Sequence, residues 1–198
     1  MTEHLDVRAH HLEETNSKTI FGFWTYLMTD CILFGTLFAT YIVLHKNTYG
    51  GPSAKELFSL PFVLTETLIL LTSSFTCTLS KLAAYRNNKN GVIGWFAVTF
   101  LLGVAFVGME LFEFNNLVHD GNSWQRSAFL SSFFTLVATH GLHISTGLLW
   151  MIILIIPVFR HGLTPVTLRR LTCLRMFWHF LDIVWIFIFT IVYLMGML

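Results

Sequence analysis

The sequence predicts an all-α membrane protein, a polytopic bundle of five transmembrane helices with a cytoplasmic N-terminus and a periplasmic C-terminus. Of its 198 residues, 55% are hydrophobic and only 12% are charged, which is about half the charged share of a typical soluble domain. The mean hydropathy is +0.66. A net charge of +1 gives no basis for a nucleic-acid partner. The apolar residues are gathered in long runs, and the cations lie mainly at alternate ends of those runs.

Five apolar runs define the predicted spans. Each run exceeds the roughly 20 residues that a helix needs to cross the hydrocarbon core of a bilayer. Helices are predicted because separate segments in lipid must satisfy their own backbone groups. Clusters of Gly, Pro and Asn separate the runs, so we expect short loops and one membrane domain, residues 19–198, after a polar N-terminal tail, residues 1–18. The spans are about 20–45, 60–84, 92–114, 127–159 and 171–198.

The distribution of Lys and Arg predicts the orientation. Nine of the 12 cations fall on the side of the N-terminus, and the other three, Lys46, Lys55 and Arg126, fall on the opposite side. Positive charge collects on the cytoplasmic side of a membrane. The predicted location is therefore the bacterial inner membrane with the N-terminus inside. The nine are Arg8, Lys18, Lys81, Arg86, Lys89, Arg160, Arg169, Arg170 and Arg175.

Ionisable residues recur within the predicted spans, where they are costly unless they face a partner. Those of the last three spans come in pairs three residues apart, so each pair shares one helix face. In the second span, Ser73 and Ser74 follow the acid and would allow another helix to come close. The eight residues are Asp30, Glu66, Glu110, Glu113, His140, His143, His179 and Asp182.

Three interpretations of these residues remain open. Paired acids and histidines occur in di-metal helical bundles, but there the ligands lie at one depth. A helical rise of about 1.5 Å per residue places Glu110 and Glu113 in the outer quarter of their span and the other pairs deeper. Hydrogen bonds between helices, in which a carboxylate accepts from a histidine N–H, are the favoured interpretation. A part in proton movement is the third. We predict no catalytic, cofactor-binding or metal-binding residue in this chain.

Three segments carry a family resemblance. Residues 139–143 (Thr-His-Gly-Leu-His), together with residues 177–185 (Phe-Trp-His-Phe-Leu-Asp-Ile-Val-Trp), resemble the signature of haem-copper oxidase subunit III. Residues 108–114 (Gly-Met-Glu-Leu-Phe-Glu-Phe) resemble another helix of that family. Residues 22–30 resemble the helix that carries a buried glutamate in mitochondrial-type members, and here the position holds Asp30. The five-helix length is similar to that of the bacterial bo-type ubiquinol oxidases.

The resemblance implies a subunit that is not catalytic alone, within a complex that oxidises ubiquinol, reduces oxygen to water and pumps protons. It implies that the chain packs against subunit I, stabilises it and supports proton uptake, alongside subunits II and IV. Haems and copper are expected in subunit I and no cofactor in this chain. It also implies bound structural phospholipid, with Arg160 matching the arginine that holds the head group.

Other functions stay open at this point. The chain could belong to another haem-copper oxidase, such as a cytochrome c oxidase. A small membrane transporter would need a solvated path between Glu66 and Asp30. A di-metal membrane hydroxylase would bind metal through the acids and histidines of the spans.

Overall fold

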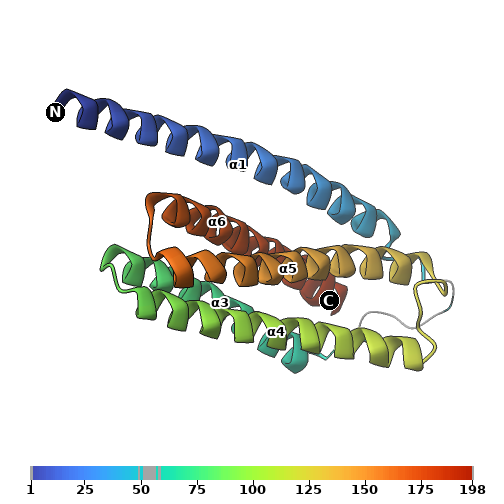
Figure 1. Cartoon of the computed structure of the whole chain (residues 1–198). Helices are drawn as coiled ribbons and strands as arrows, with labels where there is room; N and C mark the ends of the chain where they lie inside the picture. Colours follow the sequence, from blue (N-terminus) through green and yellow to red (C-terminus); the bar gives the residue numbers. More distant parts are fainter. Residues whose placement is uncertain (1, 49, 51–56, 58, 198) are drawn as a thin grey trace.

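A computed structural model describes residues 2–48, 50, 57 and 59–197 of the chain, and Figure 1 shows them as a bundle of long helices. In this part of the chain, five helices are long and apolar enough to cross a membrane. The predicted all-α membrane class is confirmed. Met1, Lys55 and Leu198, which figured in the predicted boundaries and charge distribution, lie outside the described residues. The elements are α1 (Thr2–Leu44), α3 (Leu60–Tyr85), α4 (Lys89–His119), α5 (Ala128–His161), α6 (Pro165–Ile188), the π-helical turn η1 (Phe189–Leu194) and α7 (Met195–Met197).

The two outer helices extend furthest beyond the predicted spans at their N-terminal ends. The backbone of α1 is helical from Thr2, so the polar N-terminal segment continues the first helix. The last helix starts at Pro165, six residues before the predicted residue 171. Its start is capped, because the Thr164 hydroxyl accepts a hydrogen bond from the backbone N–H of Thr167 at 3.3 Å. Proline fits the first helical position, where no backbone N–H is needed.

Short turns make neighbouring helices antiparallel. Only residues 86–88 separate α3 from α4, and the Asn88 side chain caps α4 by accepting from the backbone N–H of Gly91 at 3.0 Å. Residues 162–164 join α5 to α6, and Gly162 has a φ of +71°, which a residue with a side chain rarely adopts. The α3–α4 pair packs against the α5–α6 pair: α3 contacts α6, and α4 contacts α5.

Helix α1 lies against one side of this four-helix group. It contacts α5 and α6. Figure 1 shows it crossing the group at an angle, so that its N-terminal half stands away from the other helices.

Aromatic side chains make up much of the core of the bundle, and Trp178 of α6 is one of them. Its ring is buried. A methyl group on Gly103 of α4 would lie 2.9 Å from its Cη2 atom, and one on Gly147 of α5 would lie 3.1 Å from its Cζ3 atom. Its indole Nε1 donates to the Ser73 hydroxyl of α3 at 2.8 Å. One side chain of α6 thereby contacts three other helices.

Candidate functional site in the membrane interior

The polar side chains of α6 face α3. His179 is hydrogen-bonded through Nδ1 to the Ser74 hydroxyl at 2.6 Å and through Nε2 to the Thr78 hydroxyl at 3.2 Å. Asp182, one turn further along, lies within interaction range of the same Ser74 hydroxyl. Trp185 donates from Nε1 to the Thr67 hydroxyl at 3.1 Å. The structure therefore places His179 and Asp182 on one face, against a row of hydroxyl groups.

Three carboxyl groups lie within electrostatic range of one another toward the other end of the bundle. Glu66 comes from α3, and Glu110 and Glu113 come from α4. The Tyr193 hydroxyl of η1 donates to Glu113 Oε2 at 2.9 Å. The Glu110 carboxyl lies directly against Gly141 of α5, where an added methyl group would approach to 2.5 Å. Both Glu66 oxygens are buried without a hydrogen-bond partner among the described residues.

The two histidines of α5 lie in different environments. His143 Nε2 lies 3.9 Å from Asp30 Oδ2 of α1, which is an ion-pair distance but too long for a hydrogen bond. His143 Nδ1 lies 2.7 Å from the carbonyl oxygen of Thr139 in its own helix. The His140 ring is stacked on Trp185 with centroids 5.3 Å apart. Its two nitrogens are buried without a hydrogen-bond partner in the described part of the chain.

Several contacts of these residues join different helices. Most donors and acceptors are hydroxyl, indole and phenol groups, and acidic side chains meet Tyr193 and His143 of other elements, as Glu113 with Tyr193 and Asp30 with His143. Among the described residues, no three His, Cys, Asp or Glu side chains gather in a way that could hold a metal ion. The arrangement can position helices and hold buried polar groups in hydrocarbon.

Sequence reasoning missed several of the partners. Thr67 and Thr78 of α3, which bond Trp185 and His179, carry no signal that sets them apart from other threonines in the spans. Tyr193 was not expected to meet an acid. The spacing that paired His179 with Asp182 gave their shared face but could not identify the groups on the facing helix.

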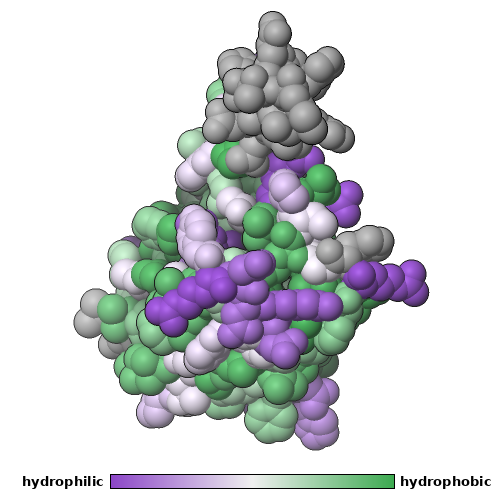
Figure 2. Space-filling model, turned by 60° about the vertical axis from the view of Figure 1, so that its left-hand side comes forward, coloured by the Kyte–Doolittle hydropathy of each residue, from purple (hydrophilic) through white to green (hydrophobic). Residues whose placement is uncertain are grey.

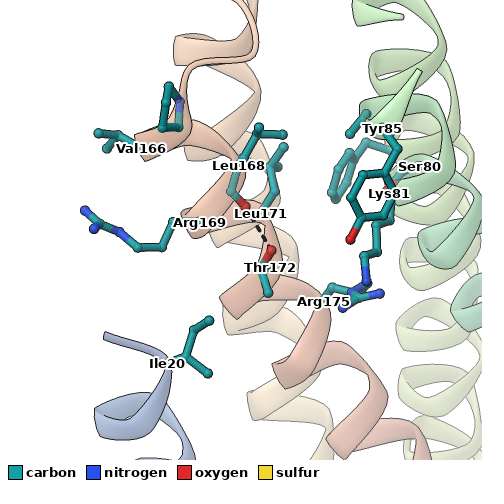
Figure 3. Close-up of a pocket in the computed structure, with 13 residues that line it drawn as sticks. Ile20, Ser80, Lys81, Tyr85, Val166, Leu168, Arg169, Leu171, Thr172 and Arg175 are labelled. Atoms are coloured by element: carbon teal, nitrogen blue, oxygen red, sulfur yellow. Dashed lines mark hydrogen bonds between the residues drawn. The ribbon is translucent and has the colours of Figure 1, made fainter. Parts of the chain in front are cut away.

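A pocket of about 620 Å³ opens between the C-terminal end of α3 and the N-terminal part of α6, with Ile20 of α1 in its lining. Figure 3 shows Lys81, Arg169 and Arg175 among its lining residues. Arg160, the residue expected to bind a lipid head group, is an exposed side chain at the C-terminal end of α5 and does not line this pocket.

Known proteins resemble this chain over almost its whole length. Residues 2–197 match the family described as cytochrome c oxidase subunit III. Cytochrome bo(3) ubiquinol oxidase subunit 3 of Pseudomonas aeruginosa is 57% identical over 188 residues, covering 95% of this chain and 90% of the relative. The protein of the same name from Buchnera aphidicola is 49% identical, covering 91% and 93%.

A relative with a different printed name is only slightly more distant. Cytochrome c oxidase subunit 3 of Bacillus sp. strain PS3 is 46% identical, covering 89% of this chain and 85% of the relative. The family match and these identities agree with the five apolar helices and with the motifs of the last three spans. The chain is thus a multi-pass membrane protein that belongs to the cytochrome c oxidase subunit III family, the subunit III family of the haem-copper oxidases.

Proposed function

We propose that this chain is the non-catalytic subunit III of a bacterial bo-type ubiquinol oxidase in the inner membrane, with its N-terminus in the cytoplasm. Two relatives named cytochrome bo(3) ubiquinol oxidase subunit 3 support the choice of complex. The excess of cations at the N-terminal end of the bundle supports the orientation. In this proposal subunit I holds the haems and copper, and subunits II and IV complete the assembly.

The observation that supports a non-catalytic role is that buried polar side chains of one helix are hydrogen-bonded to side chains of another. His179 is held by two hydroxyl groups of α3, and Glu113 is held by Tyr193. Groups fixed in this way join helices and give the chain a rigid surface for a partner subunit. The role proposed for the chain is to stabilise subunit I and to support its proton uptake.

Deleting the chain from the complex tests this role. The haem absorption spectra of the remaining complex should be unchanged, because the proposed cofactors lie in subunit I. Thermal stability and the number of turnovers before inactivation should fall. A complex that lost its haem signals on deletion, or a purified chain that oxidised ubiquinol alone, would contradict the proposal.

A cytochrome c oxidase is the second candidate, because the relative from Bacillus sp. strain PS3 carries that name. The two candidates differ in the electron donor of the complex and not in the role of this chain. Oxygen consumption by the purified complex with ubiquinol or with reduced cytochrome c as donor separates them.

Arg160 is proposed to bind the phosphate of a structural phospholipid. Its guanidinium is exposed at the end of α5 that faces the cytoplasm in this orientation. A guanidinium at this level can bind phosphate through two parallel hydrogen bonds. Mass spectrometry of the complex with Arg160→Gln should show less retained phospholipid than the unaltered complex, and equal retention would reject this role.

A further inference from the structure

Glu66 is an acidic side chain enclosed entirely by protein. It lies six residues after the start of α3 at Leu60, within a membrane-spanning helix. Its exposed fraction is 0%, and both of its carboxyl oxygens are buried without a hydrogen-bond partner among the described residues. Buried polar groups in folded proteins nearly always have a partner. The charge that Glu66 carries therefore needs an explanation.

An acidic pair on the neighbouring helix lies within electrostatic range of Glu66. The pair consists of Glu110 and Glu113 of α4, one helical turn apart. Glu110 is 3% exposed, and its Oε1 atom is also buried without a hydrogen-bond partner in the described part of the chain. The Tyr193 phenol of η1 lies within range of all three acids and donates to Glu113. If Glu66 and Glu110 were both ionised, their charges would repel each other where neither is solvated.

In the described part of the chain, these acids form no ion pair with a cation. Two described cations lie at the same end of the bundle, but Arg126 donates to the Asn122 side chain and Lys46 is exposed. The other described cations lie toward the end where α1 begins, and Figure 2 shows hydrophilic residues gathered on that end of the molecule. The described residues therefore supply no positive charge that offsets an ionised Glu66.

A positive partner from outside the chain does not reach Glu66 in this fold, because its side chain has no exposed surface. Among the described residues, no group of His, Cys, Asp and Glu side chains could hold a metal ion. A proton needs neither an opening nor a set of ligands, because it becomes part of the carboxyl group itself. Buried acids without a charged partner bind a proton and become neutral.

We infer that Glu66 and Glu110 form a buried proton-binding site, in which both carboxyl groups are protonated at neutral pH and exchange with water through Glu113. Glu113 is partly exposed, and the exposed Asn115 and Asn116 follow it in α4, so the helix becomes polar just beyond it. A proton taken up from water by the Glu113 carboxylate can pass to an ionised Glu110 one turn away. That transfer neutralises Glu110 and restores the Glu113 carboxylate.

The test is infrared spectroscopy of the purified intact complex at neutral pH. The carbonyl stretch of a protonated carboxyl group is separate from the carboxylate and amide bands, and it shifts when deuterium replaces the proton. Glu66→Gln and Glu110→Gln should each remove the signal of one protonated carboxyl group per complex. Asp120→Asn is the matched control, because it removes an exposed carboxyl group from the turn after α4. It should leave the signal of the protonated carboxyl groups unchanged.

Glu113→Gln tests the route to water. A glutamine side chain cannot take up and release a proton, so the deuterium shift of the two buried carboxyl signals should be at least about tenfold slower after transfer to heavy water. The Asp120→Asn complex should exchange at the rate of the unaltered complex. Equal exchange rates in Glu113→Gln and Asp120→Asn would remove Glu113 from the site.

Loss of a carboxylate signal in Glu66→Gln, in place of a protonated carboxyl signal, would show that Glu66 is ionised and would overturn the inference. A map of the complex with a metal ion or a cationic side chain bonded to Glu66 would do the same. Should a variant not assemble, the purified chain with isotopically labelled glutamate carboxyl groups decides: a protonated carboxyl signal that shifts on labelling is expected, and its absence rejects the site. The site needs only side chains of this chain, so its failure would leave the deletion experiment and the proposed function untouched.

Discussion

The indole Nε1 of Trp178 donates a hydrogen bond to the Ser73 hydroxyl at 2.8 Å, while the same ring fills the space between Gly103 and Gly147. A single side chain of α6 therefore fixes the relative position of α3, α4 and α5. Trp178 belongs to the segment that carries the family resemblance, and its contacts give that segment a physical role in holding the four-helix group together.

Gly103→Ala should destabilise the chain by about 1–3 kcal/mol through overpacking. The new methyl group would approach the rigid Trp178 ring to 2.9 Å and Leu148 Cδ2 to 2.8 Å. Gly108→Ala in the same helix is the control, because nothing lies within 4 Å of a methyl group there. The measurement is unfolding of the purified chain in mixed micelles, followed by circular dichroism. Equal unfolding free energies for the two variants would contradict the close packing of Trp178.

Ser73→Ala should lower the free energy of unfolding by about 1 kcal/mol, because the buried Trp178 N–H would lose its acceptor. Ser145→Ala is a matched control, since the Ser145 hydroxyl is exposed and donates to the carbonyl of Gly141 in its own helix. Tryptophan fluorescence during unfolding reports both stability and the environment of the indole. A Ser73→Ala chain as stable as the control would show that the hydrogen bond does not contribute.

Tyr193→Phe should destabilise the bundle by about 1–3 kcal/mol, because it removes the hydroxyl that donates to the buried Glu113 carboxyl. Tyr85→Phe is the control, because it removes the same hydroxyl from an exposed tyrosine at the other end of the bundle. Thermal unfolding of the assembled complex is the measurement. If the complexes with Tyr193→Phe and Tyr85→Phe unfold at the same temperature, the contact between η1 and α4 does not contribute to stability.

Asp30→Asn should change proton pumping and turnover of the complex by less than about twofold. The Asp30 carboxyl lies 3.9 Å from His143 Nε2 and makes no hydrogen bond with it, so an amide of the same size can take its place. Pumping is measured in vesicles, and the amount of assembled complex is measured in the same preparation. A large loss of pumping with normal assembly would instead assign Asp30 to proton transfer.

The sequence was sufficient for the membrane class and the number of spans, because apolar runs of this length have few alternatives in lipid. It was less informative about the ends of the helices. The start of α6 carries Pro165 and the charged pair Arg169 and Arg170, so hydropathy alone placed it outside the last span, although the Thr164 cap makes it helical. Arg169 and Arg170, expected near the end of a loop, belong to that helix.

The contacts between helices could not be predicted in the same way. A spacing of three residues predicted that His179 and Asp182 share a helix face. Which residues that face meets depends on how α3 is oriented about its own axis, and in the structure His179 meets Ser74 and Thr78. The pocket lined by Lys81 and Arg175 has the same origin, because these two cations line one pocket only when α3 packs against α6. In the sequence they contributed only to the count that set the orientation.

The π-helical turn at Phe189–Leu194 sets the direction in which the side chains of the last turns point. A π turn takes in more residues than an α turn, and Tyr193 reaches Glu113 from within it. Deleting a single residue from α6, where the winding is α-helical, would swing the phenol by about 100° around the helix axis, whereas η1 can absorb the loss of one residue by returning to α-helical winding. Chain termini usually tolerate such changes, but in this protein the exact length of α6 determines which group meets the buried acid.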